Sequence, residues 1–411
     1  MTPRPHPARA ALARGLTRRR VSRRTALGLT GLSAAGLALS ACGVQGQGGN
    51  QPAAEDFWAG KESNGRLDFA NWPLYMDPGK PELAAFTEET GIRVDYDEAI
   101  QDNPTFFGKI QPMLAQGEPI GYDLIVLTNG IELTKLIELG YLAPLDHDRL
   151  PNFAENAGRI YKHTAYDSGN RHTVPYASGI TGIAYNPDYV DREITAIADL
   201  WDPAFEGKVG MMADPQELAN FGLLRIGVAP ADSTEEDWAA AADALEEQRD
   251  LGLVRRYYSQ DYIQPLSSGD IWMSMAWSGD IFQQNAEQGT NLRFVVPEEG
   301  GTLWSDNMMI PYTAPNPVDA IMLMDFLYDA EVAADLTEYI TYIPPVPRAR
   351  DILARRAEEA EGEERELLEQ VVGSPLVFPS EADYDKLHNY VSVTTENEES
   401  FSPLFLAVSQ S

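Results

Sequence analysis

Residues 122–128 read YDLIVLT, a nearly unbroken apolar run that is typical of a strand buried on both faces of a sheet. A helical pattern at Thr105–Gln116 precedes this run, and a second at Ile131–Leu139 follows it and ends before Gly140. Because neighbouring parallel strands need a crossover connection, usually a helix, this alternation predicts a parallel sheet covered by helices on both faces.

The alternation extends upstream to residue 66. Arg66–Asn71 is a short strand candidate, and Ile92–Glu98 alternates apolar and polar residues as a half-buried strand does. Between them, Pro81–Thr90 is expected to be a helix, with proline in its first turn and Gly91 at its end. One α/β lobe therefore begins near residue 66.

A second unit of the same kind follows along the chain. Its expected elements are strands at Thr173–Asn186, Lys208–Met212 and Ile271–Trp277, and helices at Ile197–Trp201, Glu217–Ile226 and Glu235–Leu251. Strands at Phe294–Pro297 and Thr302–Ile310 are expected to return the chain toward the first lobe. Beyond them, Pro317–Tyr339 is expected to be helical with a break near Asp329, and Asp351–Val372 to be one charged helix.

This order of elements predicts two α/β lobes linked by at least two crossings of the chain. We assign residues 66–177 and 305–350 to the first lobe, and residues 178–304 and 351–411 to the second. A chain of 411 residues is long enough for about two domains.

The overall charge excludes some classes of partner. The chain has 63 Asp and Glu against 31 Lys and Arg, which gives a formal net charge of −32. Nucleic acids need clustered basic residues, so we expect no nucleic-acid partner. The acidic balance favours cationic ligands, although a solubilising surface explains it equally simply.

The basic residues gather at the N-terminus. Residues 1–41 contain eight arginines and no acidic residue, so the remaining 370 residues carry −32 − 8 = −40. The weakly apolar run Thr25–Ala41 is short for a membrane span and fits the apolar region of a signal peptide. Ser22-Arg23-Arg24-Thr25-Ala26-Leu27 resembles a twin-arginine export signal.

The single cysteine follows this run. Leu39-Ser40-Ala41-Cys42 resembles a bacterial lipobox, in which the cysteine sulfur carries a diacylglyceryl anchor. The alternative is a buried core cysteine, as lone cysteines often are. Residues 42–65 are rich in Gly, Gln, Asn and Ala and are expected to form a flexible tether. We therefore expect a lipid-anchored protein at the extracytoplasmic face of the bacterial cell membrane.

The sequence offers no positive evidence for catalysis. The histidines after the signal segment, at positions 147, 163, 172 and 388, lack metal-ligand spacing, and one cysteine excludes a Cys-based zinc site. GxSxG, phosphate-loop and GxGxxG motifs are missing from the sequence. We predict a protein that is not an enzyme and has no metal site and no cofactor.

Binding of an organic cation has better support. A buried ammonium group needs carboxylates and hydrogen-bond acceptors. Aromatic faces add cation–π attraction of about 0.5–2 kcal/mol each and provide flat walls for methylene groups. A polyamine site should therefore combine Trp and Tyr with Asp and Glu.

Two clusters have this composition. Asn71-Trp72-Pro73-Leu74-Tyr75 follows a strand, where ligand crevices of open α/β sheets lie, although a core tryptophan under a proline turn is an equal alternative. In Trp304-Ser305-Asp306, strand periodicity places Trp304 and Asp306 on one face, an aromatic wall beside a carboxylate. Since Asp is unfavourable inside a strand, Asp306 requires a partner.

Two further groups are more ambiguous. Asp214-Pro215-Gln216-Glu217 fits a helix start with Asp214 as N-cap and Glu217 at the third position, but a capping carboxylate keeps lone pairs for a ligand. Trp277 and Asp280 follow the end of a strand and form a weaker pair.

Eight short motifs in order resemble the spermidine/putrescine-binding proteins of ABC importers. They are NWPLY at 71–75, FTEETGIRV at 86–94, YDLIV at 122–126, VPYASG at 174–179, ADLWDP at 198–203, DPQE at 214–217, EGGTLWSD at 299–306 and YIPP at 342–345. Each motif is weak alone, but the series spans roughly residues 66–350.

The resemblance implies a type II periplasmic-binding-protein fold, in which two lobes joined by a hinge close on the ligand. The family's aromatic box would comprise Trp72, Tyr75, Trp277, Trp304 and Tyr342, and its carboxylates Asp214, Glu217 and Asp306. The implied partners are a polyamine and the permease subunits of an ABC transporter, with the protein acting as a monomer.

Some positions depart from the family pattern. Pro73 stands where the family often has a hydroxyl residue; Thr128 is kept, but Gly130 stands where a nearby tyrosine is common. Asp280 replaces a small residue and adds a carboxylate to the expected site. The ligand could be spermidine, putrescine or a related cation. The alternatives are another solute of this fold, such as thiamine, iron or a sugar, and an extracytoplasmic hydrolase.

Overall fold

A computed structural model describes residues 54–410. The expected signal peptide, Cys42 and the beginning of the tether lie outside these residues. Within them, one mixed sheet has the strand order β2-β1-β3-β9-β4-β7-β5-β6, with β10 beside β9 and β8 beside β4. The strands are β1 (Arg66–Ala70), β2 (Arg93–Asp97), β3 (Leu124–Thr128), β4 (Thr173–Tyr185), β5 (Val209–Met212), β6 (Val254–Tyr258), β7 (Met273–Trp277), β8 (Arg293–Val295), β9 (Gly301–Met309) and β10 (Leu387–His388).

The parallel arrangement expected around residues 122–128 is confirmed. Strand β1 pairs in parallel with β2 on one side and with β3 on the other. Four of the five residues of β3 are buried, as the apolar run indicates. In the second lobe, β5 likewise pairs in parallel with both β6 and β7.

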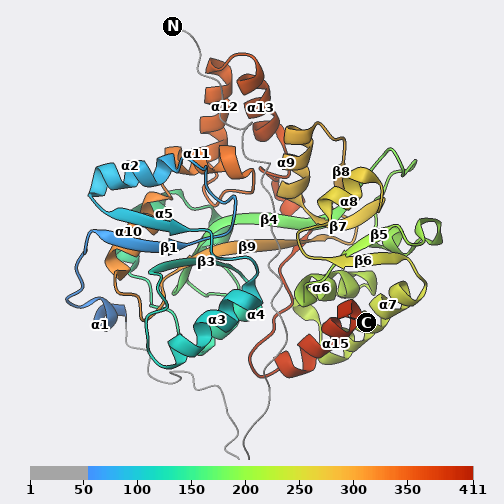
Figure 1. Ribbon diagram of the computed structural model, residues 1–411, viewed down its shortest axis with the longest axis horizontal. Coiled ribbons are helices and arrows are strands. Elements are labelled where there is room, and N and C mark those ends of the chain that lie inside the picture. Colours follow the sequence, from blue (N-terminus) through green and yellow to red (C-terminus); the bar gives the residue numbers. More distant parts are fainter. Residues whose placement is uncertain (1–53, 411) are drawn as a thin grey trace, which may run out of the picture. The chain divides into compact units, whose positions relative to one another are not determined.

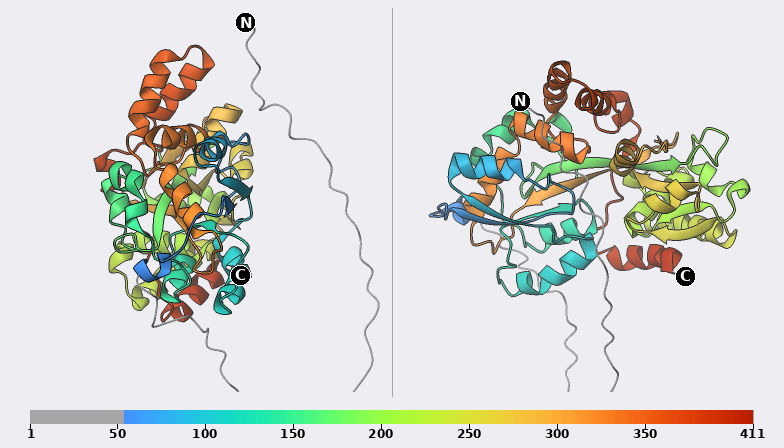
Figure 2. Two further views of the ribbon diagram at one scale, coloured as in Figure 1. Left: turned by 90° about the vertical axis from the view of Figure 1, so that its left-hand side faces the viewer. Right: turned by 45° about the horizontal axis from the view of Figure 1, so that its top comes forward.

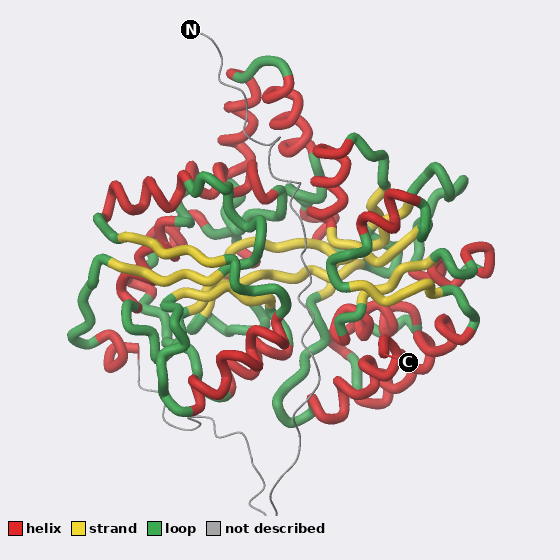
Figure 3. The backbone as a smooth tube through the Cα atoms, viewed as in Figure 1, coloured by secondary structure: helices red, strands yellow, loops and turns green. Residues whose placement is uncertain are grey.

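Strands β4 and β9 connect the two lobes. The β9 residues near Met309 pair antiparallel with both β3 and the beginning of β4, whereas the end of β4 pairs with β7 and β8. Every residue of β4 is buried. Figures 1 and 3 show both strands running through the middle of the sheet, so two long antiparallel strands provide the expected crossings.

Helices cover both faces of the sheet. They are α1 (Ala54–Trp58), α2 (Pro81–Thr90), α3 (Asn103–Ala115), α4 (Ile131–Glu138), α5 (Pro151–Asn156), α6 (Pro215–Arg225), α7 (Glu235–Asp250), α8 (Ile263–Ser268), α9 (Ser278–Gln288), α10 (Pro317–Phe326), α11 (Ala330–Ile340), α12 (Ala349–Glu359), α13 (Glu363–Gly373), α14 (Glu381–Tyr384) and α15 (Glu398–Gln410). In the first lobe, α2 and α11 lie on one side of β1–β3, and α3 and α4 on the other (Figure 1). In the second lobe, α6, α7 and α15 lie on one side of β5–β7, and α8 and α9 on the other (Figure 1).

The hydrophobic cores follow this division. One face of the first lobe buries Phe69, Phe86 and Tyr328, and its other face buries Phe107 and Tyr141. The second lobe has its own core, which includes Phe221, Trp238 and Phe401 from three different helices. Trp238, expected to be a packing residue, meets Phe401 edge-on at 5.2 Å between ring centroids. The exact residue division between the lobes stays a prediction.

The expected flexible tether is wrong for residues 54–65. Residues Ala54–Trp58 form helix α1, and Phe57 and Trp58 are buried in the first core. The Trp58 indole donates to the Pro144 carbonyl oxygen at 2.7 Å. The Asn64 backbone N–H donates to Asp319 at 2.9 Å, which fixes the chain just before β1. Two bulky aromatic residues in an otherwise small, polar segment explain the difference.

The expected single helix at Asp351–Val372 is also wrong. The chain forms two helices, α12 and α13, because Ala360 adopts an extended conformation (φ −79°, ψ 161°) that ends α12, and Gly362, with a φ of 65°, is the N-cap of α13. Figures 1 and 2 show this helical hairpin projecting from the sheet. Leu353 and Leu368 belong to the first core, which favours placing the hairpin with the first lobe.

Two further results concern the helices. The helical break expected near Asp329 is confirmed, with Asp329 capping α11. Across residues 54–410, none of the helices combines the length and apolar character needed to cross a membrane.

Candidate functional site

Asp306 lies where β9 meets β3 and β4. It pairs in register with Thr128 of β3, and the Thr128 hydroxyl donates to its Oδ1 at 2.7 Å. The Tyr75 hydroxyl donates to its Oδ2 at 2.5 Å. The side chain is 2% exposed, so burial raises its pKa to about 6, while the two donors lower it. Asp306, expected to require a partner inside the strand, thus has two hydroxyl partners.

Glu217 lies on the first turn of α6 in the second lobe. Its Oε1 accepts from the Thr181 hydroxyl at 2.7 Å, the Trp277 indole at 3.0 Å and the Tyr390 hydroxyl at 2.8 Å. Its Oε2 is buried and has no partner among the described residues. Burial and the nearby charge of Asp214 raise the pKa of Glu217 to about 7. One oxygen is thus held by three donors, whereas the other has none among the described residues.

Asp280 is the third carboxylate of this region. It lies at the start of α9, where its Oδ2 accepts from the Tyr262 hydroxyl at 2.8 Å and its Oδ1 from Tyr342 at 3.1 Å. Burial raises its pKa, against the opposite effect of the two hydroxyl donors. The Tyr262 hydroxyl also accepts from the backbone N–H of Trp277, which links Asp280 to the strand end of β7.

Aromatic rings join the three carboxylates. The Trp304 ring lies edge-on to Tyr342 at 5.3 Å and to Trp277 at 6.5 Å between centroids. Tyr342 in turn lies 6.0 Å from Tyr75, whose hydroxyl bonds Asp306. Trp304 and Asp306 therefore reach the same cluster, as strand periodicity predicts. We call these linked side chains the acidic aromatic cluster: Tyr75, Thr128, Glu217, Trp277, Asp280, Trp304, Asp306 and Tyr342.

Two predicted residues have weaker links to this cluster. Asp214 is the N-cap of α6, where its Oδ1 accepts from the backbone N–H groups of Gln216 at 2.8 Å and Glu217 at 3.1 Å. The cap is thus confirmed, but the Glu217 side chain does not complete a capping box, because it bonds to cluster residues instead. Trp72 is half-buried against the first-lobe cores, and its indole N–H has no partner among the described residues.

The cluster contains uncompensated negative charge. Within residues 54–410, the hydrogen bonds to Glu217, Asp280 and Asp306 all come from neutral hydroxyl or indole groups, and each Lys or Arg ion pair involves other acids. Buried carboxylates without a counter-charge are unfavourable, and the raised pKa values express this cost. A cationic ligand would supply the missing charge.

Sequence reasoning missed three residues that contact these carboxylates. Thr181 lies inside the long strand β4, Tyr262 precedes α8, and Tyr390 lies in the C-terminal segment. None belongs to a motif, and Tyr390 is 173 positions from its partner Glu217. Only long-range contacts could have identified them.

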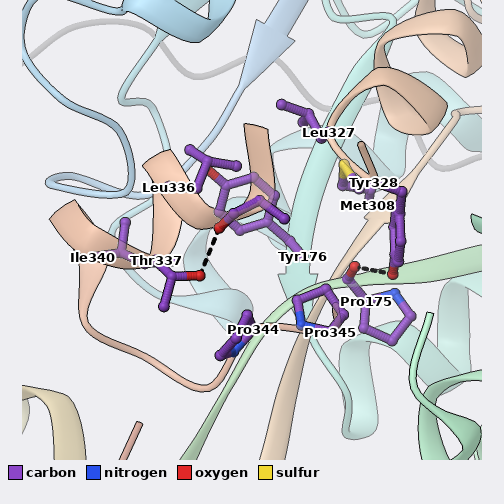
Figure 4. Close-up of a pocket in the computed structure, with 11 residues that line it drawn as sticks. Pro175, Tyr176, Met308, Leu327, Tyr328, Leu336, Thr337, Ile340, Pro344 and Pro345 are labelled. Carbon is purple, nitrogen blue, oxygen red and sulfur yellow. Dashed lines mark hydrogen bonds between the residues drawn. The ribbon is translucent and has the colours of Figure 1, made fainter. Parts of the chain in front are cut away.

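A small cavity lies behind the cluster rather than in it. Figure 4 shows it between β4, β9 and α11, with Tyr176, Met308 and Thr337 among its lining residues. Its volume of about 10 Å³ leaves room for roughly one water molecule. The Thr337 hydroxyl there already donates to the Ala333 carbonyl oxygen at 2.6 Å. Tyr176 stacks on Tyr75 at 5.9 Å, so the cavity lies behind a ring of the site.

Replacing Gly179 by alanine is expected to disturb the site through Trp304. The added Cβ would lie 2.2 Å from Cζ2 of the indole, so the ring must move. Overpacking of this kind costs about 1–3 kcal/mol of unfolding free energy. Chemical denaturation measures this loss. Gly108→Ala is the control, because a Cβ added there would have no neighbour within 4 Å, and a wild-type unfolding free energy for Gly179→Ala would contradict the close approach.

A family model for bacterial extracellular solute-binding proteins matches residues 83–361. The chain is 31% identical over 294 residues to the spermidine/putrescine-binding periplasmic protein of Escherichia coli, covering 71% of this chain and 81% of that protein. It is 32% identical over 324 residues to the putrescine/agmatine-binding protein of Pseudomonas aeruginosa, covering 75% of this chain and 84% of that protein.

Solved structures have a similar fold. The spermidine/putrescine ABC transporter substrate-binding protein of Streptococcus pneumoniae superposes with a TM-score of 0.70 at 26% identity, covering 84% of this chain and 98% of that one. A transporter protein from Listeria monocytogenes gives a TM-score of 0.69 at 25% identity. The type II fold with two lobes, expected from the sequence, is confirmed.

Proposed function

Because the chain belongs to the bacterial extracellular solute-binding proteins, we propose that it captures a polyamine between its two lobes and delivers it to the permease of an ABC transporter. The proteins that it resembles are binding proteins of transporters rather than enzymes. The names of its relatives specify spermidine, putrescine and agmatine, all cations with ammonium or guanidinium groups.

One observation carries the choice of ligand: the acidic aromatic cluster holds three carboxylates and no basic partner among the described residues. A diamine or triamine would neutralise these charges, and its methylene chain would pack against the rings of Trp277, Trp304 and Tyr342. The free Oε2 of Glu217 is an acceptor for one ammonium group. Asp214 has a second carboxylate oxygen that capping leaves free for another.

Binding is proposed to work through lobe closure. Asp306 on β9 and Tyr75 in the loop after β1 belong to the first lobe, whereas Glu217, Trp277 and Asp280 belong to the second. A cation that contacts carboxylates on both sides would therefore stabilise the closed arrangement, with β4 and β9 as the crossings about which the lobes turn. The permease would then recognise the closed, loaded form.

The proposal extends to export and anchoring. We propose that residues 1–41 direct twin-arginine export and are removed, and that Cys42 then carries a lipid anchor at the extracytoplasmic face of the membrane. The protein would act there as a monomer. Metabolic labelling with a radioactive fatty acid should label the wild type and not Cys42→Ser, and an unacylated mature wild-type protein would contradict the anchor.

A ligand panel tests the central proposal. Thermal-shift assays should show a raised melting temperature with spermidine, putrescine or agmatine, because a ligand that binds the folded state stabilises it. Thiamine, ferric iron and a sugar serve as the other solutes of this fold. Stabilisation by one of these and by no polyamine would overturn the choice of ligand, and turnover of a substrate would favour a hydrolase.

Polyamine affinity is expected to fall as the pH is lowered from 8 to 5.5. Glu217 and Asp306 have pKa values of about 7 and about 6, so both take up protons across this range, and a protonated carboxyl cannot pair with an ammonium group. Bound ligand lowers both pKa values, so binding near pH 6.5 should release protons. Calorimetry in buffers of different ionisation enthalpy measures this release. An affinity independent of pH would contradict the assignment of these two carboxylates.

A further inference from the structure

Helix α4 of the first lobe contacts the second lobe at the residue that precedes Glu217 of the acidic aromatic cluster. The backbone N–H of Ile131 donates to Oε1 of Gln216 at 2.9 Å, and Gln216 lies on α6 of the second lobe. The Ile131 side chain packs in the core of the second lobe. Lys135, one turn further along α4, forms a 2.6 Å ion pair with Glu398 of α15. These contacts exist only while the lobes are together.

The Gln216 carboxamide serves as the missing cap of α4. A helix N-terminus leaves backbone N–H groups without partners, and the N-cap side chain usually accepts from one of them. Here the N-cap is Gly130, which has no side chain, and Gln216 accepts in its place from the opposite lobe. An added Cβ at Gly130 would lie 2.3 Å from Oε1 of Gln216, and its φ of 152° also disfavours other residues. Gly130 therefore permits the close approach.

Gln216 is tied to the ligand side chains by its position on α6. It stands between Pro215 and Glu217, and its own backbone N–H donates to the capping carboxylate of Asp214. It is 7% exposed, and its Nε2 lies 3.5 Å from the Val391 carbonyl oxygen of the C-terminal segment. One turn of α6 thus carries two proposed ammonium-binding carboxylates and the cap of the other lobe's helix.

At the same interface the Glu132 and Asp214 carboxyls repel each other, whereas the Lys135–Glu398 ion pair attracts. Glu132 of α4 has a pKa raised to about 7 by burial and then by the charge of Asp214 across the interface; Glu398 adds to this effect and Lys135 reduces it. An ammonium group at Asp214 would reduce the repulsion. Ligand and Gln216 would then favour the same closed arrangement.

We propose that Gln216 is a positioning residue that holds the two lobes closed, by capping helix α4 of the first lobe from helix α6 of the second. The cap supports a closed population in the absence of ligand and lowers the free energy that the ligand must provide for closure. Its effect on polyamine affinity rests on the function proposed above, whereas its effect on closure does not.

Distances between spin labels on the two lobes test this proposal. Labels at Lys109→Cys on α3 and Glu247→Cys on α7, in the full chain carrying Cys42→Ser, report lobe separation by pulsed electron resonance. Without ligand, the labelled protein that retains Gln216 should show a short-distance population that labelled Gln216→Ala lacks. Saturating spermidine or putrescine should restore this population in Gln216→Ala. The dissociation constant of Gln216→Ala should rise about tenfold, as loss of one buried hydrogen bond implies.

Gln248→Ala is the matched control. Gln248 is a fully buried glutamine of the second lobe whose Nε2 donates to the Leu200 carbonyl oxygen at 2.9 Å, within the same lobe. It should keep the wild-type distance distribution despite any loss of stability. A wild-type distribution for Gln216→Ala would overturn the proposal. Because these distances are measured without ligand, failure of every polyamine to bind would refute the proposed function and leave this result intact.

Discussion

Replacing Asp306 by alanine is expected to weaken polyamine binding by ~2 kcal/mol or more, which is about thirtyfold or more in the dissociation constant. The substitution leaves an ammonium group buried without its carboxylate. It also leaves the hydroxyls of Tyr75 and Thr128 without the acceptor that they now share. Since unpaired buried charge is the larger cost, the loss should exceed that from removal of either hydroxyl alone.

Calorimetric titration with spermidine and with putrescine measures this effect. Asp306→Asn separates charge from shape, because it keeps an oxygen acceptor for the two hydroxyls while removing the negative charge. Asp319→Asn is the control: Asp319 is fully buried, but it accepts from Asn64 at the far end of the first lobe. Asp319→Asn should change stability and leave affinity unchanged. Wild-type affinity in Asp306→Ala would remove this residue from the site.

Much of the fold could be predicted from local sequence patterns. The apolar run at 122–128 identifies β3, and the alternation around it gives the parallel pairing of β1, β2 and β3. The placement of Trp304 and Asp306 on one face follows from the two-residue period of a strand. These features depend on residues near one another in the chain, so the sequence alone displays them.

The rest depends on contacts between distant residues. Glu217 has the position of a capping residue on α6, yet Thr181, Trp277 and Tyr390 hold its carboxylate elsewhere. The space beside Gly130 is occupied by Gln216 of the other lobe, which no pattern near Gly130 indicates. Local sequence is equally compatible with a cap and with a ligand site, and tertiary packing decides between them.

Replacing Glu217 by glutamine is expected to change binding and stability in opposite directions. At pH 8, the wild-type carboxyl is ionised in both folded and unfolded protein, but its folded pKa of about 7 exceeds the ordinary value of 4.5. The folded protein therefore binds more protons between these values, and the stability of the unliganded protein falls as the pH rises through this window. The raised folded pKa corresponds to a cost on the order of 3 kcal/mol at pH 8.

Glutamine removes that ionisation. The unfolding free energy of unliganded Glu217→Gln should therefore exceed that of the wild type by about 1–3 kcal/mol at pH 8 and differ little from it at pH 5. Polyamine affinity should fall by about 2 kcal/mol or more, because one ammonium group loses its counter-charge. Urea denaturation at both pH values and calorimetric titration measure the two effects.

Glu82→Gln is the control, since burial also raises the pKa of Glu82 but its carboxyl lies outside the acidic aromatic cluster. It should gain stability at pH 8 without losing affinity. A gain in stability together with a loss of affinity indicates that the carboxylate binds a cationic ligand and does not stabilise the fold. Unchanged affinity in Glu217→Gln would show that Glu217 has a structural role instead.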